Sequence, residues 1–398
     1  MVSGSKTGIF FMVLLWLLLG AELPAQAGAY GEVPETETGM QAQLEDDLLE
    51  EFDLEPLEEF LTQGNEEGFS VSFRELLELL KKGEVNGAVR RILDGVKENL
   101  FGEVRENGRW MGQILILGLL GAVFANYASI FTGSQIAEMG FYVTYLFIFT
   151  FLASSFLTGL TVTKELLGQV LEFMRALVPA FFLSVSFAGG SVTSSAGCSL
   201  MLISIRLVEW LFLTLFLPLI QMYILLVLAG HLIKEDLFSR TTELLEQGLR
   251  WGVKTMTGAV LGFHLLQGMV VPYADAVKNA PLRRLVGAIP SVGNGAAAVS
   301  QMLLGAGALM KNSIGAGAAL VLLGLSAIPL LKLLILGLFY QGTAALLQPV
   351  CDKRLISCIS GVGTGSRLLL LAASSSVLLF LLSIAIVCLG SNTMYLAG

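Results

Sequence analysis

Six long apolar runs between residues 111 and 390 restrict this chain to folds that a lipid bilayer can hold. They cover residues 111–131, 139–160, 207–230, 252–272, 314–340 and 368–390. About 20 residues at 1.5 Å each are enough for a helix to cross a hydrocarbon core about 30 Å thick. Charged residues make up only 14% of the chain, against about a quarter in soluble domains. The sequence therefore predicts an all-α, polytopic membrane domain over residues 111–398 with six spans.

Two segments leave this span count open between five and eight. Residues 177–190 are apolar but follow Glu172 and Arg175, and residues 285–313 are rich in glycine. Either segment could be re-entrant or interfacial, because irregular backbone at membrane depth must be buried in protein or face water. The basic residues of the predicted loops, among which we count Lys311, are spread almost evenly over the two sides and do not fix the orientation.

The start of the chain has the pattern of a secretory signal sequence. Lys6 precedes an apolar run over residues 9–19, and the small-residue pattern Ala25-Gln26-Ala27 follows. The run of about 11 residues is shorter than the roughly 20 of a spanning helix. We predict a signal peptide over residues 1–27 with cleavage after Ala27. An uncleaved anchor helix is the alternative, and both readings export the segment that follows.

Residues 28–110 differ from the rest of the chain in charge. They hold 21 acidic and 8 basic residues, a net charge of −13, whereas residues 111–398 hold 10 and 15, a net charge of +5. Ser72 and Glu75 form a capping box, which predicts helix from about residue 72. We expect a small acidic extracytoplasmic segment. Neither part has the clustered basic residues of a nucleic-acid binder.

The sequence lacks the residue patterns of the common enzyme classes. It contains no HExxH, GxSxG, Walker-type or CxxC motif. His231 and His264 are its two histidines, and a structural metal site needs three or four ligands. Cys351 and Cys358 could pair, although we favour thiols over a disulfide. We therefore predict no enzymatic activity, no cofactor and no bound metal.

Three ionisable residues fall within or beside the predicted spans, where a central charge costs about 2.5–3.5 kcal/mol. Arg206 and Glu209 are three residues apart on one helical face and can pair. This predicts a structural ion pair, and the alternative is a polar pore lining. Lys332 follows Pro329, and the sequence places no acidic residue within a helical turn of it. It could snorkel, pair with another helix or face water.

Glycine is concentrated between residues 285 and 317, where Gly293, Gly305 and Gly315 are the positions we single out. Small residues allow helices to approach closely. We therefore predict close helix crossings here. A hinge or a pore-lining element made from broken helices is the alternative.

Five short segments, taken together, carry a family resemblance. They are Phe173–Pro179, Gly189–Ser194, Ile289–Gly293, Met310–Gly315, and Leu347–Pro349 with Ile356–Cys358. In this order and at these spacings the chain resembles the stage III sporulation protein AE family. The resemblance extends from about Ser72 to the C-terminus.

This resemblance implies a non-enzymatic, multi-pass subunit of a secretion-like complex or channel between mother cell and forespore. Such a complex is required for endospore formation and late forespore gene expression. The implied location is the mother-cell-derived membrane around the forespore. The implied partners are a cytoplasmic ATPase, ring-forming proteins, a forespore-side partner and the lipid bilayer. A stand-alone secondary transporter is the alternative, because Gly/Pro-interrupted apolar segments and intramembrane charges also occur in transporters.

Overall fold

The computed structural model describes residues 55–63, 72–81, 134–188, 191–230, 238–287 and 293–392, with positions 87, 112, 113, 115, 116, 119, 120 and 123 between them. Every regular element in this part of the chain is a helix, which confirms the all-α prediction. The predicted signal peptide and the cleavage site after Ala27 lie outside the described residues. So do residues 28–54 and most of the first predicted span, 111–131.

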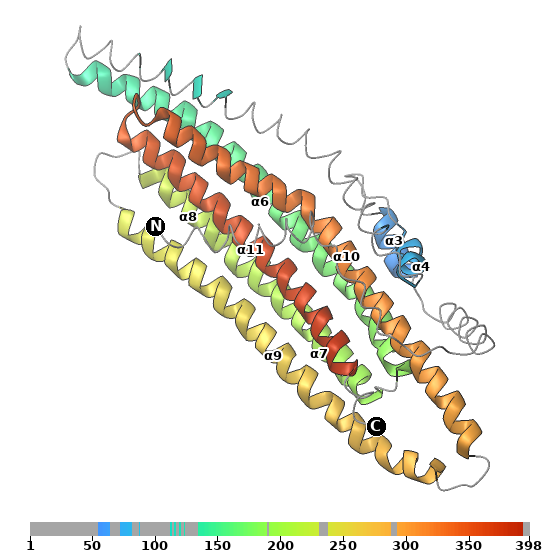
Figure 1. Cartoon of the computed structure of the whole chain (residues 1–398). Coiled ribbons are helices and arrows are strands. Elements are labelled where there is room, and N and C mark those ends of the chain that lie inside the picture. Colours follow the sequence, from blue (N-terminus) through green and yellow to red (C-terminus); the bar gives the residue numbers. More distant parts are fainter. Residues whose placement is uncertain are drawn as a thin grey trace.

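Long helices lie side by side in an elongated bundle (Figure 1). They are α6 (Ser134–Phe187), α7 (Ser191–Glu209), the π-helix η1 (Trp210–Phe216), α8 (Leu217–Gly230), α9 (Ser239–Gly287), α10 (Gly293–Leu347) and α11 (Lys353–Asn392). α7, η1 and α8 form one continuous course. α10 has 55 residues and is therefore about 80 Å long. The helices greatly exceed the thickness of a hydrocarbon core.

Four helical segments among the described residues are long and apolar enough to cross a membrane. They are Tyr142–Phe187, Ser194–Gly230, Leu304–Leu347 and Lys353–Leu389. Four of the predicted runs overlap them almost completely, namely 139–160, 207–230, 314–340 and 368–390. The predicted run 252–272 lies in α9, which is not one of the four. The structure thus supports a multi-pass membrane protein and leaves the count of six a prediction.

The two segments that left the span count open are both helical where they are described. Residues 177–187 continue α6 past Pro179, and residues 293–313 are the first part of α10. α6 and α10 therefore extend well into these two segments.

The core of the bundle is centred on α11, which packs against α6, α8, α9 and α10. Two buried tyrosine hydroxyls of the core bond to a neighbouring helix, whereas Ser376 Oγ on α11 has no hydrogen-bond partner. The Tyr145 hydroxyl donates to the Leu228 carbonyl oxygen, and the Tyr340 hydroxyl donates to Ser155 Oγ at 2.7 Å. These bonds fix α6 against α8 and α10 and satisfy both tyrosine hydroxyls.

Two short helices from the acidic segment pack on the side of the bundle away from α9 (Figure 1). α3 (Glu55–Gln63) packs on α6, and α4 (Phe73–Lys81) packs on α10. α4 begins one residue after Ser72, whose Oγ accepts a hydrogen bond from the Glu75 backbone N–H at 3.4 Å. Leu57 and Leu61 of α3 and Phe73 and Leu77 of α4 are buried, so each short helix turns an apolar face to the bundle.

Candidate functional site

A column of polar side chains runs along the contact between α9 and α11 in an otherwise apolar bundle. We call it the polar seam, and it consists of Tyr223, Glu246, Arg250, Gln341, Thr364 and Arg367. These residues come from α8, α9, α10 and α11. Four helices therefore contribute to a single polar cluster.

Hydrogen bonds and charge interactions connect the polar seam. Arg250 Nε donates to Glu246 Oε1 at 2.8 Å, and Arg367 Nη2 donates to Thr364 Oγ1 at 2.9 Å. With its amide oxygen turned toward α11, Gln341 accepts from Arg367 Nη1 at 2.7 Å. Glu246 and Arg250 also interact electrostatically with Arg367. Glu246 is thus ion-paired with Arg250 and attracts Arg367 electrostatically, and the cluster carries a net positive charge.

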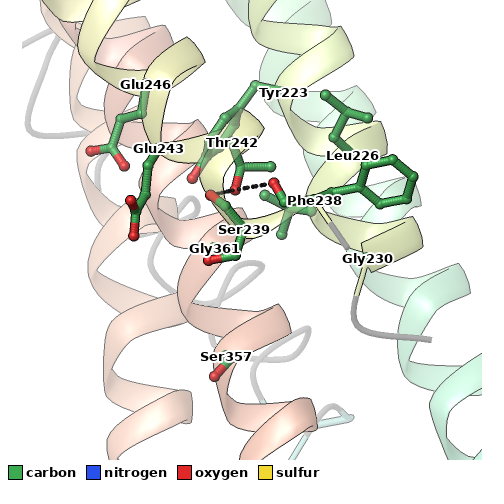
Figure 2. A pocket seen from close by; sticks show the side chains of 11 residues that line it. Tyr223, Leu226, Gly230, Phe238, Ser239, Thr242, Glu243, Glu246, Ser357 and Gly361 are labelled. Atoms are coloured by element: carbon green, nitrogen blue, oxygen red, sulfur yellow. Dashed lines mark hydrogen bonds between the residues drawn. The ribbon is translucent and has the colours of Figure 1, made fainter. Parts of the chain in front are cut away.

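A cavity of about 290 Å³ adjoins the polar seam, because Tyr223 and Glu246 line both. α8, α9 and α11 enclose it, and its remaining polar lining comes from Ser239, Thr242, Glu243 and Ser357. Figure 2 shows the Thr242 hydroxyl bonded to the Phe238 and Ser239 backbone oxygens, at 3.1 and 2.9 Å. The cavity is large enough for several waters. Water or a small polar solute in it would reach Glu246.

A second charged cluster joins α6 to the end of α7. Glu209 Oε2 accepts from Arg206 Nη1 at 2.6 Å and from Arg175 Nη2 at 2.5 Å. The structure thus forms the Arg206–Glu209 contact that the spacing predicted, and it adds Arg175, which the sequence reasoning did not connect with it. The Arg206 side chain is 78% exposed. The cluster lies at the surface of the bundle, directly before η1.

The other singled-out residues lie away from the polar seam. Lys332 is half-buried on α10. An added Cβ at Gly315 would collide with Cys388 Sγ and lie 3.3 Å from the Phe181 ring, so this glycine marks a close helix crossing. Gly305 is half-buried on the same helix. Gly293 is the first residue of α10, and its surroundings are outside the described residues.

Lys311 and Gly307 are two positions whose importance the sequence reasoning missed. Lys311 is fully buried on α10 and donates from Nζ to the Cys388 carbonyl oxygen at 3.3 Å. A Cβ at Gly307 would lie 2.6 to 2.7 Å from the backbone of Phe187 and Ala188. The six-span count makes Lys311 a loop charge, because the residue lies between the predicted spans 252–272 and 314–340. The helical periodicity of Met310–Gly315, which continues into the following apolar run, could have indicated that Lys311 lies in a helix.

The described residues contain no group of three or more His, Cys, Asp and Glu side chains that could hold a metal ion. His264 is buried on α9 and interacts with Gln267, while His231 lies outside the described residues. All four cysteines are described, and none forms a disulfide. Burial and the Asp352 carboxylate raise the pKa of the Cys351 thiol, which lies in the turn after α10.

Long apolar helices with a partly buried polar seam are the arrangement of a multi-pass helical membrane protein. The sequence matches the profile of the family described as Stage III sporulation protein AE over residues 71–391, and the chain belongs to this family. It is also 22% identical over 294 residues to the Stage III sporulation protein AE of Bacillus subtilis (strain 168), covering 74% of each chain. No solved structure matches. The resemblance of the five short segments is thereby confirmed, and family membership implies a role in sporulation.

Proposed function

We propose that this protein is a non-enzymatic membrane subunit of the secretion-like complex or channel that joins the mother cell to the developing forespore. It would act in the mother-cell-derived membrane around the forespore and support late forespore gene expression. The observation that carries the proposal is the family match over residues 71–391, which includes α4 and nearly all of the long bundle. Four helices long enough to cross a membrane, among the residues described, support it.

The partners in this proposal are other subunits of the stage III sporulation complex. They include a cytoplasmic ATPase, ring-forming proteins and a forespore-side partner. The outer face of α9 supports a role in assembly, because it mixes large apolar residues with charges. Leu244 and Trp251 are 70% and 72% exposed, and the Arg240 side chain beside them is 93% exposed. A mixed face of this kind suits contact with protein better than contact with lipid.

Affinity purification from sporulating cells during engulfment tests the proposal. The tagged full chain should co-purify with the other stage III subunits. A multi-pass membrane protein of unrelated function, with the same tag and at the same level, should not. A normally abundant chain that recovers none of these subunits would contradict the proposal.

A stand-alone secondary transporter is the second candidate, and the polar seam with its cavity is the observation that favours it. Transporters usually bind solutes where helices are interrupted, whereas α6 and α10 pass Pro179 and Pro329 without ending. The subunit role is therefore preferred. We expect the purified chain in lipid vesicles to accumulate no solute when a proton or sodium gradient is applied, and accumulation would favour the transporter.

A further inference from the structure

We propose that the bilayer surrounds only one half of the bundle, and that the other half projects from the membrane on the side to which the N-terminal segment is exported. The bilayer half contains residues 142–163 of α6 and residues 210–230 of η1 and α8, with the parts of α10 and α11 beside them. The projecting half contains residues 164–187 of α6, and α7. The orientation rests on the export of the N-terminal segment that the signal sequence predicts.

Helix length makes a partly embedded bundle necessary. α6 has 54 residues, a length of about 81 Å. Transmembrane helices tilt by up to about 40°, and at that tilt α6 would still extend about 62 Å along the membrane normal. The hydrocarbon core is only about 30 Å thick. About half of α6 must therefore lie outside it.

The exposed side chains of α6 show where the boundary lies. Residues 142–163 include no charged residue, and their exposed large side chains are Val143, Leu146, Phe147 and Leu157. From Lys164 onward the exposed surface of α6 is charged, because it includes Lys164, Glu165, Glu172 and Arg175. The uncharged part is about 33 Å long. That length matches one hydrocarbon core.

The neighbouring helix changes character at the same level. Residues 210–230 contain no charge and expose Trp210, Leu215, Met222 and Leu225, while Arg206 and Glu209 precede them. The Tyr145 bond to the Leu228 carbonyl brings the uncharged parts of α6 and α8 together. The Arg175–Glu209 ion pair brings the charged parts together. Trp210 lies at the boundary, where tryptophan is enriched in membrane proteins.

The acidic helices α3 and α4 show that the projecting half faces water. The Phe60 ring of α3 lies 6.0 Å from the Phe173 ring of α6. Phe73 and Leu77 of α4 lie 3.4 to 3.5 Å from a Cβ built at Gly317 of α10. The two short helices expose Glu55, Glu59, Arg74, Glu75 and Glu78, and each such charge in hydrocarbon would cost about 2.5–3.5 kcal/mol. Because α3 and α4 belong to the N-terminal segment, the half beneath them lies on the exported side.

α9 departs from this pattern most clearly, and α11 also exposes a charged residue, Arg367. Arg240, Glu243 and Lys254 are exposed on it, although Gly252 packs 3.1 Å from Phe216 of η1 when a Cβ is added. This face of α9 is therefore turned to another subunit and not to lipid. The lipid-facing perimeter of the bilayer half is formed by α6, η1, α8 and the exposed parts of α10.

Labelling of single added cysteines along α6 tests the proposal in the full chain. The variants are Leu146→Cys and Leu157→Cys in the bilayer half, and Glu172→Cys and Leu183→Cys in the projecting half. Each is produced in vegetative cells, and protoplasts are treated with a membrane-impermeant maleimide. The parent with its four native cysteines is the control, and its labelling is subtracted.

We expect Glu172→Cys and Leu183→Cys to label in intact protoplasts at least about 10-fold faster than the bilayer-half pair, because a thiol in hydrocarbon is neither reached nor ionised. The bilayer-half pair should label only in detergent. Lys164→Cys replaces any projecting-half variant that fails to accumulate. Labelling of the projecting half only after the protoplasts are lysed would overturn the orientation. Equal labelling of both pairs, or labelling of neither before detergent, would overturn the division into halves. If the chain shows this labelling pattern but does not co-purify with the other stage III subunits, only the proposed function is contradicted.

Discussion

The seam between α10 and α11 is closed by glycine, whereas the seam between α9 and α11 is held by charges and hydroxyls. At Gly315 and Gly363 an added Cβ would press on Cys388 and Tyr340 of the facing helix. On α9, a Cβ at Gly248, Gly258 or Gly262 would meet nothing within 4 Å, although one at Gly268 would lie 2.8 Å from Ile386 of α11. A glycine-rich membrane helix is thus not by itself a closely packed one. The α10–α11 seam depends on shape, and the polar seam depends on a hydrogen-bond network.

Substitution of Gly315 by leucine should give the largest effect, because the α10–α11 seam has no room for it. Overpacking costs about 1–3 kcal/mol, occasionally more, and here the contact is with Cys388 and Phe181. Membrane level and thermal stability in detergent should both fall. The matched control is Gly262→Leu on α9, where a Cβ meets open space. Equal stability of the two variants would show that the two seams do not differ.

Replacement of Glu246 by alanine should give an intermediate effect in the polar seam. It removes the carboxylate that pairs with Arg250 and attracts Arg367 electrostatically. Breaking a fully buried pair costs about 3–5 kcal/mol, and partial exposure here reduces the expected loss to about 1–2 kcal/mol. Thermal unfolding of the purified chain in detergent measures it. Glu246→Gln should recover part of the loss, and Glu243→Ala, an exposed partner of Arg240, should cost little. If Glu246→Ala lowers thermal stability no more than Glu243→Ala does, the polar seam does not act as a network.

Replacement of Arg206 by alanine should give the smallest effect, because its ion pair with Glu209 is exposed to water. The Arg206 side chain is 78% exposed, and exposed pairs contribute about 0–1 kcal/mol. Arg175→Ala should cost more, since Arg175 joins α6 to α7. Thermal stability and sporulation frequency of both variants decide this. Normal abundance of Arg206→Ala combined with a block in sporulation would assign the residue a functional role instead.

Local features of the structure could be predicted from the sequence, and contacts between helices could not. The spacing of Arg206 and Glu209 predicted their contact because both lie on one helical turn. Glu246 and Arg367 are far apart in sequence, and nothing in either segment indicates that α9 and α11 are neighbours. The polar seam was missed for this reason.

Helix length was underestimated for a related reason. Hydropathy detects the apolar part of a helix. α6 nevertheless continues through Lys164 and Glu172, because one face of the helix remains buried there. Leu167, Val170, Leu171 and Met174 are all buried there. The sequence also does not show which glycines lie at close helix crossings. Gly307 packs against a facing backbone and Gly262 lies beside open space, but nothing in their sequence neighbourhoods distinguishes them.

The π-helix η1 fixes the rotational phase of α8 relative to α7. Its backbone bonds run from residue i+5 to residue i, as in the Leu217 N–H bond to the Phe212 oxygen, so the segment takes in a residue that an α-helix would not. Each residue advances an α-helix by about 100°. A one-residue deletion within η1 would return this segment to regular α-helix and would keep Ile224 and Val227 of α8 against Gly365 and Gly361 of α11. The same deletion in α8 between Leu217 and Ile224 would turn these two side chains by about 100°, away from α11.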